Sequence, residues 1–259
     1  MPDFHKPVIK IPKKILLFAA VFALFGCATV GRPSEYSMIT LPGRNNLVIL
    51  GASGRQLRHT DEIAIAREEA ALKASMYHGF TASAVELFSA GPGYLDYMHE
   101  SYSWVDYNQP AEYYMERLTF DEAKDVFRDR NGNVFIRFSY PAAFPANINY
   151  RFERNPDGRP VWTIRPPSEI AGFVAGVGHS GRLVRFSDTF RASYEAAAVA
   201  ITSRVSTYIG EDNVSVQDRA GTQIYRRSVG NLTQFLVLET WIDPQTRGVY
   251  TLAIARPVD

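Results

Sequence analysis

The chain has 259 residues, of which 46% are hydrophobic and 21% charged, and its 28 basic residues nearly balance its 27 acidic ones. This composition is typical of a globular protein and argues against wholesale disorder, a collagen-like repeat or a multi-span membrane protein. A formal net charge of +1 gives no long-range electrostatic field that would attract polyanions, so we expect no nucleic-acid partner. A single cysteine excludes an internal disulfide and any cysteine-based metal cluster.

Residues 1–26 have the pattern of an export signal. Four lysines precede the apolar run from Ile15 to Phe25, which is shorter than the about 20 residues that cross a bilayer. The run ends at the tetrapeptide Leu24-Phe25-Gly26-Cys27, which contains the only cysteine of the chain. A signal anchor with an incidental cysteine is the alternative interpretation.

The tetrapeptide resembles the lipobox of bacterial lipoproteins, although Phe25 is larger than the usual occupant of its position. The resemblance implies that Cys27 is lipidated and becomes the mature amino terminus, with acyl chains such as palmitate as a membrane anchor. Ala28 stands where an inner-membrane retention signal has Asp, so we expect the periplasmic face of the outer membrane. Residues 27–46 are rich in Pro, Gly and Asn and are predicted to be a tether.

An internal repeat follows the tether. A shift of 127 positions aligns Gly51-Ala-Ser-Gly-Arg55 with Gly178-His-Ser-Gly-Arg182, and the 29 positions from Gly51 to Gly79 then contain nine identities. Chance gives about one identity in 16 for an ordinary composition, so the pattern indicates duplication. We therefore predict two homologous domains, residues 47–154 and 160–259, joined by the turn-rich segment 155–160.

Each copy begins with a short apolar run that suits a buried strand, continues through a glycine loop and enters a helix. Thr60 and Ser187 are the predicted hydroxyl caps of the two helices. The first helix is expected from Ile63 to about Phe88. The second has one apolar stripe from Phe190 to Ile209.

Hairpins are predicted after each helix. In the first copy the strands are 115–127 and 133–140, with a turn at 129–132. In the second copy they are 222–225, 234–242 and 249–254, with a turn at 243–248. The fold class is therefore α+β, with two homologous small domains, each a short antiparallel sheet packed with one long helix. Sheets this small have open edges that favour pairing with another copy or subunit.

The glycines, the alanine-rich helix and the closing pair Trp241-Ile-Asp-Pro and Val249-Tyr-Thr-Leu together resemble the Lpp-twenty-type family of bacterial outer-membrane lipoproteins, to which a flagellar-assembly lipoprotein is similar. The resemblance covers residues 170–256 best and 46–141 more loosely. It implies a dodecin-like domain and a structural or scaffolding role in an envelope machine, with flagellum assembly as one context. The family usually has one copy of the domain, whereas this chain has two.

Catalytic and cofactor motifs are only partly matched. Gly176-Val-Gly-His-Ser-Gly181 fits the dinucleotide pattern G-x-G-x-x-G, but the helix is predicted to begin too late for its glycines to meet a pyrophosphate. Ser180 half-matches a nucleophile elbow, in which Arg182 replaces the last glycine. No metal-ligand spacing occurs among the histidines that follow the signal, which are His59, His78, His99 and His179. We expect no cofactor, no metal and no enzyme activity.

Two sets of residues are candidate contact sites. Arg55, Arg58, Arg182 and Arg185 recur in both copies before the helix, where an anion, a glycan or an intersubunit acid could bind, with a solvated loop as the alternative. An aromatic insertion in the first copy includes Tyr94, Tyr97, Tyr102 and Trp104, which are candidates for a partner surface or for ordinary sheet.

The sequence therefore predicts a non-enzymatic lipoprotein of the outer membrane that associates with itself or with envelope-complex proteins. The alternatives are a binding module for cell-wall glycan (peptidoglycan) and a serine-type hydrolase at Ser180.

Overall fold

The structure is a computed structural model that describes residues 37–40, 45–90, 100–144, 147–206, 208–216 and 219–258. Cys27, Tyr94, Tyr97 and His99 lie outside the described residues. Residues Glu35–Asp259 form one compact unit. Its elements in chain order are β1 (Ser37–Ile39), β2 (Leu47–Ser53), α2 (His59–His78), β3 (Phe80–Ala90), β4 (Glu100–Tyr107), α3 (Glu112–Met115), α4 (Glu122–Asp125), β5 (Val126–Arg128), β6 (Val134–Tyr140), the 3-10 helix η1 (Val161–Thr163), β7 (Glu169–Ile170), β8 (Phe173–Ser180), α5 (Phe186–Val205), β9 (Tyr208–Val216), β10 (Arg219–Ile242) and β11 (Val249–Pro257).

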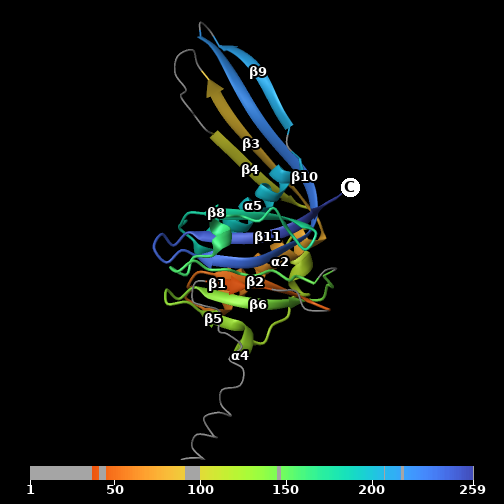
Figure 1. Cartoon of the computed structure of the whole chain (residues 1–259). Helices are drawn as coiled ribbons and strands as arrows, with labels where there is room; N and C mark the ends of the chain where they lie inside the picture. Colours follow the sequence, from red (N-terminus) through yellow and green to blue (C-terminus); the bar gives the residue numbers. More distant parts are fainter. Residues whose placement is uncertain are drawn as a thin grey trace, which may run out of the picture. The chain divides into compact units, whose positions relative to one another are not determined.

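The described strands form two antiparallel sheets (Figure 1). The larger sheet has the order β4-β3-β10-β11-β8-β7, and β1 and β9 also pair with β10. The smaller sheet has the order β2-β6-β5. Antiparallel sheets packed with two long helices confirm the predicted α+β class.

The two halves, residues 47–154 and 160–259, share an order in which a strand leads into a long helix and antiparallel strands follow, although α3, α4 and β5 occur in the first half alone among the described residues. α2 runs from His59 to His78 and α5 from Phe186 to Val205, so both helices begin and end 127 positions apart. The strand before each helix pairs with a closing strand in the same register, since Ser53 faces Val134 in β2–β6 and Ser180 faces Val249 in β8–β11. These correspondences support a duplication, which stays a proposal.

Close packing of helix on strand explains the repeated glycines. Gly51 lies in β2 and Gly178 in β8, and not in the loops predicted for them. A Cβ atom on Gly51 would stand 1.9 Å from the carbonyl oxygen of Ala66, and one on Gly178 would stand 2.0 Å from that of Ser193. Because Ala66 and Ser193 are themselves 127 positions apart, both halves bring the helix backbone onto the strand at the same place.

Both hydrophobic cores contain residues of both halves. One core joins Phe138 of β6 and the alanines of α2 to Phe173 of β8 and Trp241 of β10. The other joins Phe135 of β6 to the buried face of α5. The predicted boundary at 154–160 is therefore not a boundary between compact units. All described core side chains lie in 38–255, so we expect the unit to fold without residues 1–34.

Residues 37–40, predicted as part of the tether, instead belong to the fold. β1 pairs with β10, and Ser37 and Met38 are buried. The fully buried carboxylate of Glu239 in β10 accepts hydrogen bonds from the Ser37 hydroxyl and the Trp162 indole, and it pairs with Arg154. A buried charge requires partners of this kind, so β1 and the segment around residue 154 are both fixed to β10.

The predicted helix ends are wrong in both halves. α2 ends at His78 because Gly79 has a φ of 147°, and the following residues form β3. α5 ends at Val205, which leaves Ile209 in β9. The predicted stripe of Phe190, Tyr194, Ala197, Ala198 and Ile201 is buried as expected.

The predicted caps and two strands also differ. Arg58 and Arg185 are the N-cap residues, without side-chain caps. The segment 115–127 contains the last residue of α3, the whole of α4 and the start of the short strand β5. β10 is one strand through 219–242, with a bulge near Gln234, whose φ is 54°.

Within the described residues, no helix is both long and apolar enough to span a membrane.

Candidate binding surfaces

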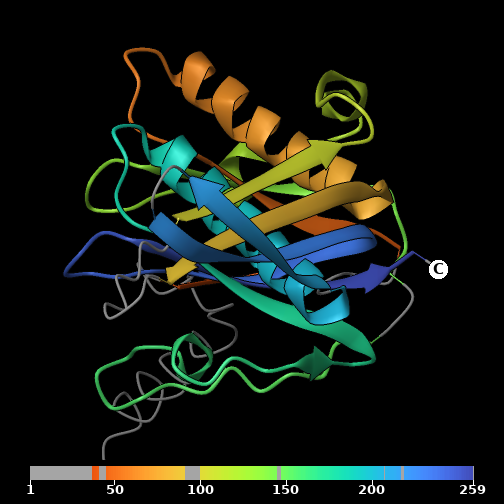
Figure 2. The same ribbon diagram turned by 90° about the horizontal axis from the view of Figure 1, so that it is seen from above.

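A polar cleft of about 900 Å³ lies where the loops before α2 and α5 meet. Figure 2 shows these loops, orange and teal, at the same end of the molecule as the blue β10–β11 turn. The basic side chains that line the cleft are Arg55, Arg182, Arg185, Arg191 and Arg247, and the acidic ones are Glu68, Glu69 and Asp188. The cleft therefore carries more positive than negative charge, which favours an anionic ligand.

The five arginines fall into two groups. Arg191 donates to Glu69 Oε1 from Nε at 2.9 Å and reaches Glu68 at 3.3 Å, and Arg247 reaches Asp129 at 3.5 Å. Arg55, Arg182 and Arg185 are exposed and have no ion pair within the described ranges. Only the second group is free to meet a ligand without breaking an existing pair.

The structure thus brings together three of the four predicted arginines. Arg58 is the exposed N-cap of α2 and does not line the cleft. Sequence reasoning missed Arg191 and Arg247, because Arg191 has no counterpart in the first copy and Arg247 lies in a hairpin turn far along the chain. No local pattern joins these residues to the glycine loops.

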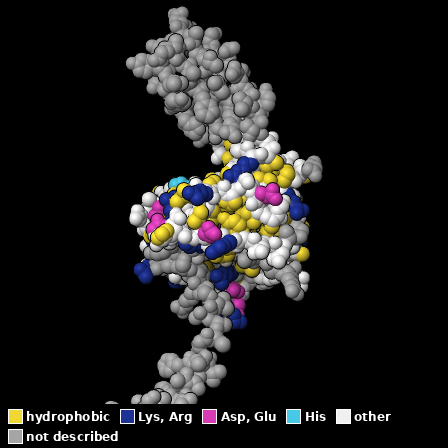
Figure 3. Space-filling view, in the orientation of Figure 1, with side chains coloured by type: hydrophobic (Ala, Val, Ile, Leu, Met, Phe, Trp, Pro, Cys, Tyr) yellow, Lys and Arg dark blue, Asp and Glu magenta, His cyan; other side chains and the backbone are white. Residues whose placement is uncertain are grey.

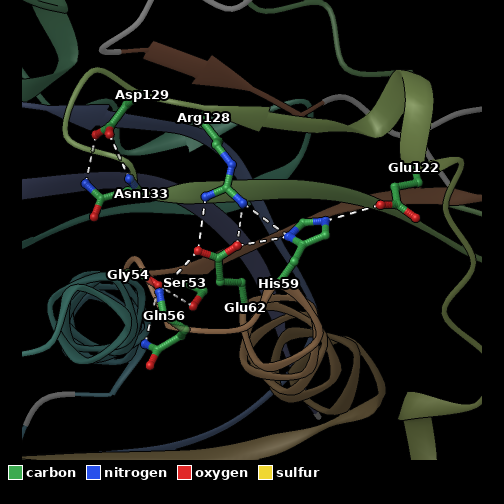
Figure 4. Close-up of polar contacts among 9 residues, drawn as sticks. All are labelled: Ser53, Gly54, Gln56, His59, Glu62, Glu122, Arg128, Asp129 and Asn133. Carbon is green, nitrogen blue, oxygen red and sulfur yellow. Dashed lines mark hydrogen bonds and ion pairs between the residues drawn. The ribbon is translucent and has the colours of Figure 1, made fainter.

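A polar network around the buried carboxylate of Glu62 fixes the first loop of the cleft (Figure 4). Glu62, whose side chain is 3% exposed, accepts from the Gln56 backbone at 3.1 Å and from Arg128 Nη1 at 3.0 Å, and it lies 2.9 Å from His59 Nδ1. His59 in turn reaches Glu122 of α4 at 3.2 Å. Arg128 is the main reason that the pKa of Glu62 is lowered to about 2.

The second loop has a related contact without charge. The Leu183 backbone donates to Thr189 Oγ1 at 2.9 Å, and both residues lie 127 positions after Gln56 and Glu62. Each loop is therefore held by a side chain from the first turns of its own helix, so its shape does not depend on a ligand.

The turns beside the cleft are also preformed. Asp129 Oδ1 accepts the backbone N–H of Asn131 at 2.8 Å. Its Oδ1 also accepts the backbone N–H of Asn133 at 2.9 Å, and its Oδ2 accepts from the Asn133 side chain at 2.8 Å (Figure 4). Asp243 accepts from the Gln245 backbone in the corresponding turn of the second half. These are the hydrogen bonds of an Asx turn.

Ser180 has the environment of a structural residue. It is buried at the end of β8, and its hydroxyl donates to the Gly181 carbonyl at 3.0 Å. Ser53 makes the same bond to Gly54 at 2.8 Å. His179 lies on the opposite face of the strand, with its ring 4.2 Å from that of Tyr250. The geometry therefore does not pair His179 with Ser180 as base and nucleophile.

The dinucleotide motif is also part of a strand. Five of its six residues lie inside β8, and α5 begins only at Phe186. Gly176 and Gly178 therefore face the helix backbone of α5 instead of a phosphate. Among the described residues, no group of three His, Cys, Asp or Glu side chains could hold a metal ion.

A second surface lies on β4, where two of the predicted aromatic residues are found. In the described part of the chain β4 pairs only with β3, so it is an edge strand (Figure 1). Tyr102 and Trp104 are 55% and 43% exposed, and their spacing of two places them on the same face. The edge strand belongs to a four-stranded section of the larger sheet, which consists of β4, β3, the first half of β10 and β9.

The face in Figure 3 shows Lys and Arg side chains interspersed with other types and not gathered into one basic area. This agrees with the near-neutral charge of the chain. Comparison with known protein families, curated proteins and solved structures finds no match.

Proposed function

We propose that the protein is a lipid-anchored lipoprotein of the outer membrane, facing the periplasm, that works by assembly with itself or with a larger envelope complex. The observation that carries the assembly is the edge strand β4, which presents Tyr102 and Trp104 to solvent. An unpaired strand edge offers a row of backbone donors and acceptors to another strand, and aromatic side chains are enriched at interfaces.

The lipobox-like tetrapeptide supports the anchor, and Cys27 is the proposed site of lipidation. A diacylglycerol with a further acyl chain gives stable membrane attachment, because each buried CH₂ contributes about 0.8 kcal/mol. The anchor would hold many copies at one leaflet, which raises their effective concentration for assembly.

The test of assembly is the mass of the detergent-extracted full chain. We expect a defined oligomer for the unchanged protein, and the single protomer for Trp104→Lys, since a lysine on an edge strand opposes pairing. Tyr113→Lys is the matched control, because Tyr113 is also exposed, at 56%, but lies on α3. A monomer at all concentrations, or an oligomer indifferent to Trp104→Lys, would contradict the proposal.

The anchoring half is tested separately by labelling cells with a palmitate analogue. We expect the label on the unchanged protein and its loss in Cys27→Ser, which also leaves the chain unprocessed. Equal labelling of both would exclude lipidation at Cys27.

A second candidate function is binding of cell-wall glycan. A cavity of about 320 Å³ is lined by His78, Gln109, Tyr113, Tyr114 and Arg117. Aromatic faces combined with polar side chains suit a sugar ring. Cosedimentation with purified sacculi that is lost in Tyr113→Ser would favour this function.

A further inference from the structure

The two loops that enter the long helices carry the same surface pattern. The first reads Arg55-Gln56-Leu57-Arg58 and the second Arg182-Leu183-Val184-Arg185, and the two are 127 positions apart. We call them the docking loops. Each loop contains an apolar side chain between two arginines.

The central apolar residues are fully exposed. Leu57 and Val184 each have 104% of the reference accessible surface, and Leu183 has 46%. One exposed apolar side chain on a surface needs no explanation. Two at corresponding positions of two loops, each flanked by arginines, indicate a surface that is made to be covered.

The arginines of the docking loops are available for an anionic surface. Arg55, Arg182 and Arg185 line one cleft and have no ion pair within the described ranges, and Arg58 is exposed. The positive ends of the α2 and α5 dipoles point to the same loops. Asp61, the acid nearest to the first loop, lies in the first turn of α2. Asp188, in the first turn of α5, lines the cleft together with Glu68 and Glu69, and the last two pair with Arg191.

We call the exposed side chains of Leu57 and Val184 the tips of the docking loops. A ligand of these loops has to match both the positive charge of the arginines and the apolar tips. A free anion would use the arginines but not the tips. A phospholipid surface uses both, because its phosphates pair with arginine and its acyl boundary accepts Leu and Val side chains. Figure 2 shows both loops side by side at one end of the molecule, and residues of both line the same cleft, so that one ligand surface can contact both loops.

We propose that the docking loops bind an anionic phospholipid surface, with Leu57 and Val184 inserted at the acyl boundary and Arg55, Arg58, Arg182 and Arg185 on the lipid phosphates. The docking loops share no residue with β4 and do not include Cys27. It adds a second point of attachment, and two points fix the orientation of the compact unit on the membrane.

The experiment uses residues 28–259, which contain the whole compact unit and no lipid anchor. Binding is measured by cosedimentation with vesicles of phosphatidylcholine alone and of phosphatidylcholine with phosphatidylglycerol in equal amounts. We expect binding to the anionic vesicles only, and its loss in 1 M salt, where the Debye length is about 3 Å.

Serine variants test the tips. We expect Leu57→Ser and Val184→Ser each to weaken binding about tenfold, and the double variant about a hundredfold, because each removes one inserted side chain. Ile164→Ser is the matched control, since Ile164 is 56% exposed on a different segment, and it should bind as the unchanged chain does. The exposed positions leave the fold intact, which circular dichroism verifies.

Three results would overturn the proposal. The first is no binding to anionic vesicles, and the second is binding that the double serine variant leaves unchanged. The third is displacement by inorganic phosphate beyond that by chloride at equal ionic strength, which would assign the arginines to a free anion. Because this chain lacks the anchor and the readout is not oligomer mass, each result is distinguishable from failure of the proposed assembly.

Discussion

At the scale of single residues, the repeated glycines serve packing and not chemistry. Gly178 and Gly51 stand where a helix backbone crosses a strand, and a methyl group at either position would enter the helix main chain. Backbone cannot move aside as a flexible side chain can. The identities at these positions are therefore explained without a bound nucleotide.

We predict that Gly178→Ala lowers the free energy of unfolding by about 1–3 kcal/mol, because the new Cβ forces α5 away from β8. The matched control is Gly181→Ala, since no heavy atom lies within 4 Å of a Cβ placed there, and it should stay within about 0.5 kcal/mol of the unchanged chain. Urea unfolding followed by circular dichroism measures both. Equal effects of the two substitutions would show that the helix–strand contact is not the reason for Gly178.

Sequence reasoning succeeded for such residues where a pattern repeats and failed where a contact is distant. The offset of 127 places Arg55 beside Arg182 in one cleft, as expected from shared architecture. No pattern in the sequence around Glu62 predicts its contact with Arg128, which lies 66 positions away in β5. The exposed side chains Leu57 and Val184 could have been predicted from the sequence, since each lies between the two arginines of its own loop.

At the scale of elements, polar contacts connect elements that hydrophobic periodicity does not connect. Glu62 of α2 pairs with Arg128 of β5, and the His59 ring contacts Glu122 of α4. Local patterns predicted the long helices, but they predicted one strand over 115–127, where the chain instead forms the short helix α4 and only the start of β5. The run is too short and mixed for its periodicity to separate helix from strand.

The Glu62 network makes stability depend on pH. The pKa of Glu62 is about 2 in the folded chain against 4.5 without the network, so its contribution is complete above pH 4.5 and is lost as the pH falls toward 2. We predict that Glu62→Gln costs about 1–3 kcal/mol of unfolding free energy at pH 6 and distinctly less at pH 3.

The control for this prediction is Glu116→Gln, at an exposed carboxylate outside the network. It should change the unfolding free energy by less than about 0.5 kcal/mol at either pH. Urea unfolding at pH 6 and pH 3 supplies the measurement. A cost for Glu62→Gln that is equal at both values would mean that the charge on Glu62 does not stabilise the loop.

At the scale of the whole molecule, the two halves are interlocked. β3 of the first half pairs with β10 of the second through 11 residue pairs, from Thr222–Ala90 to Leu232–Phe80. The cores are shared in the same way, so neither half has a complete core of its own. Sequence similarity within the chain predicted two halves. It could not show that β3 and β4 of the first half join the sheet of the second, or that each core contains residues of both, because the partner of a sheet edge is set by the tertiary fold.

We therefore predict one cooperative unfolding transition for residues 28–259. Phe138→Ala removes a fully buried ring of the first half and should cost about 3–5 kcal/mol. In a Trp104→Phe background the remaining tryptophans are Trp162 and Trp241, both outside the first half. Unfolding followed by their fluorescence should show the same loss of unfolding free energy.

The control for cooperativity is Leu57→Ala, which changes a fully exposed side chain of the first half and should leave the fluorescence midpoint in place. Two independent domains would give a different result. Phe138→Ala would then produce an earlier step in circular dichroism while the tryptophan transition stayed where it was. A common shift of both signals requires that the halves unfold together, because a side chain of one half can lower the midpoint seen from the other only through a shared core.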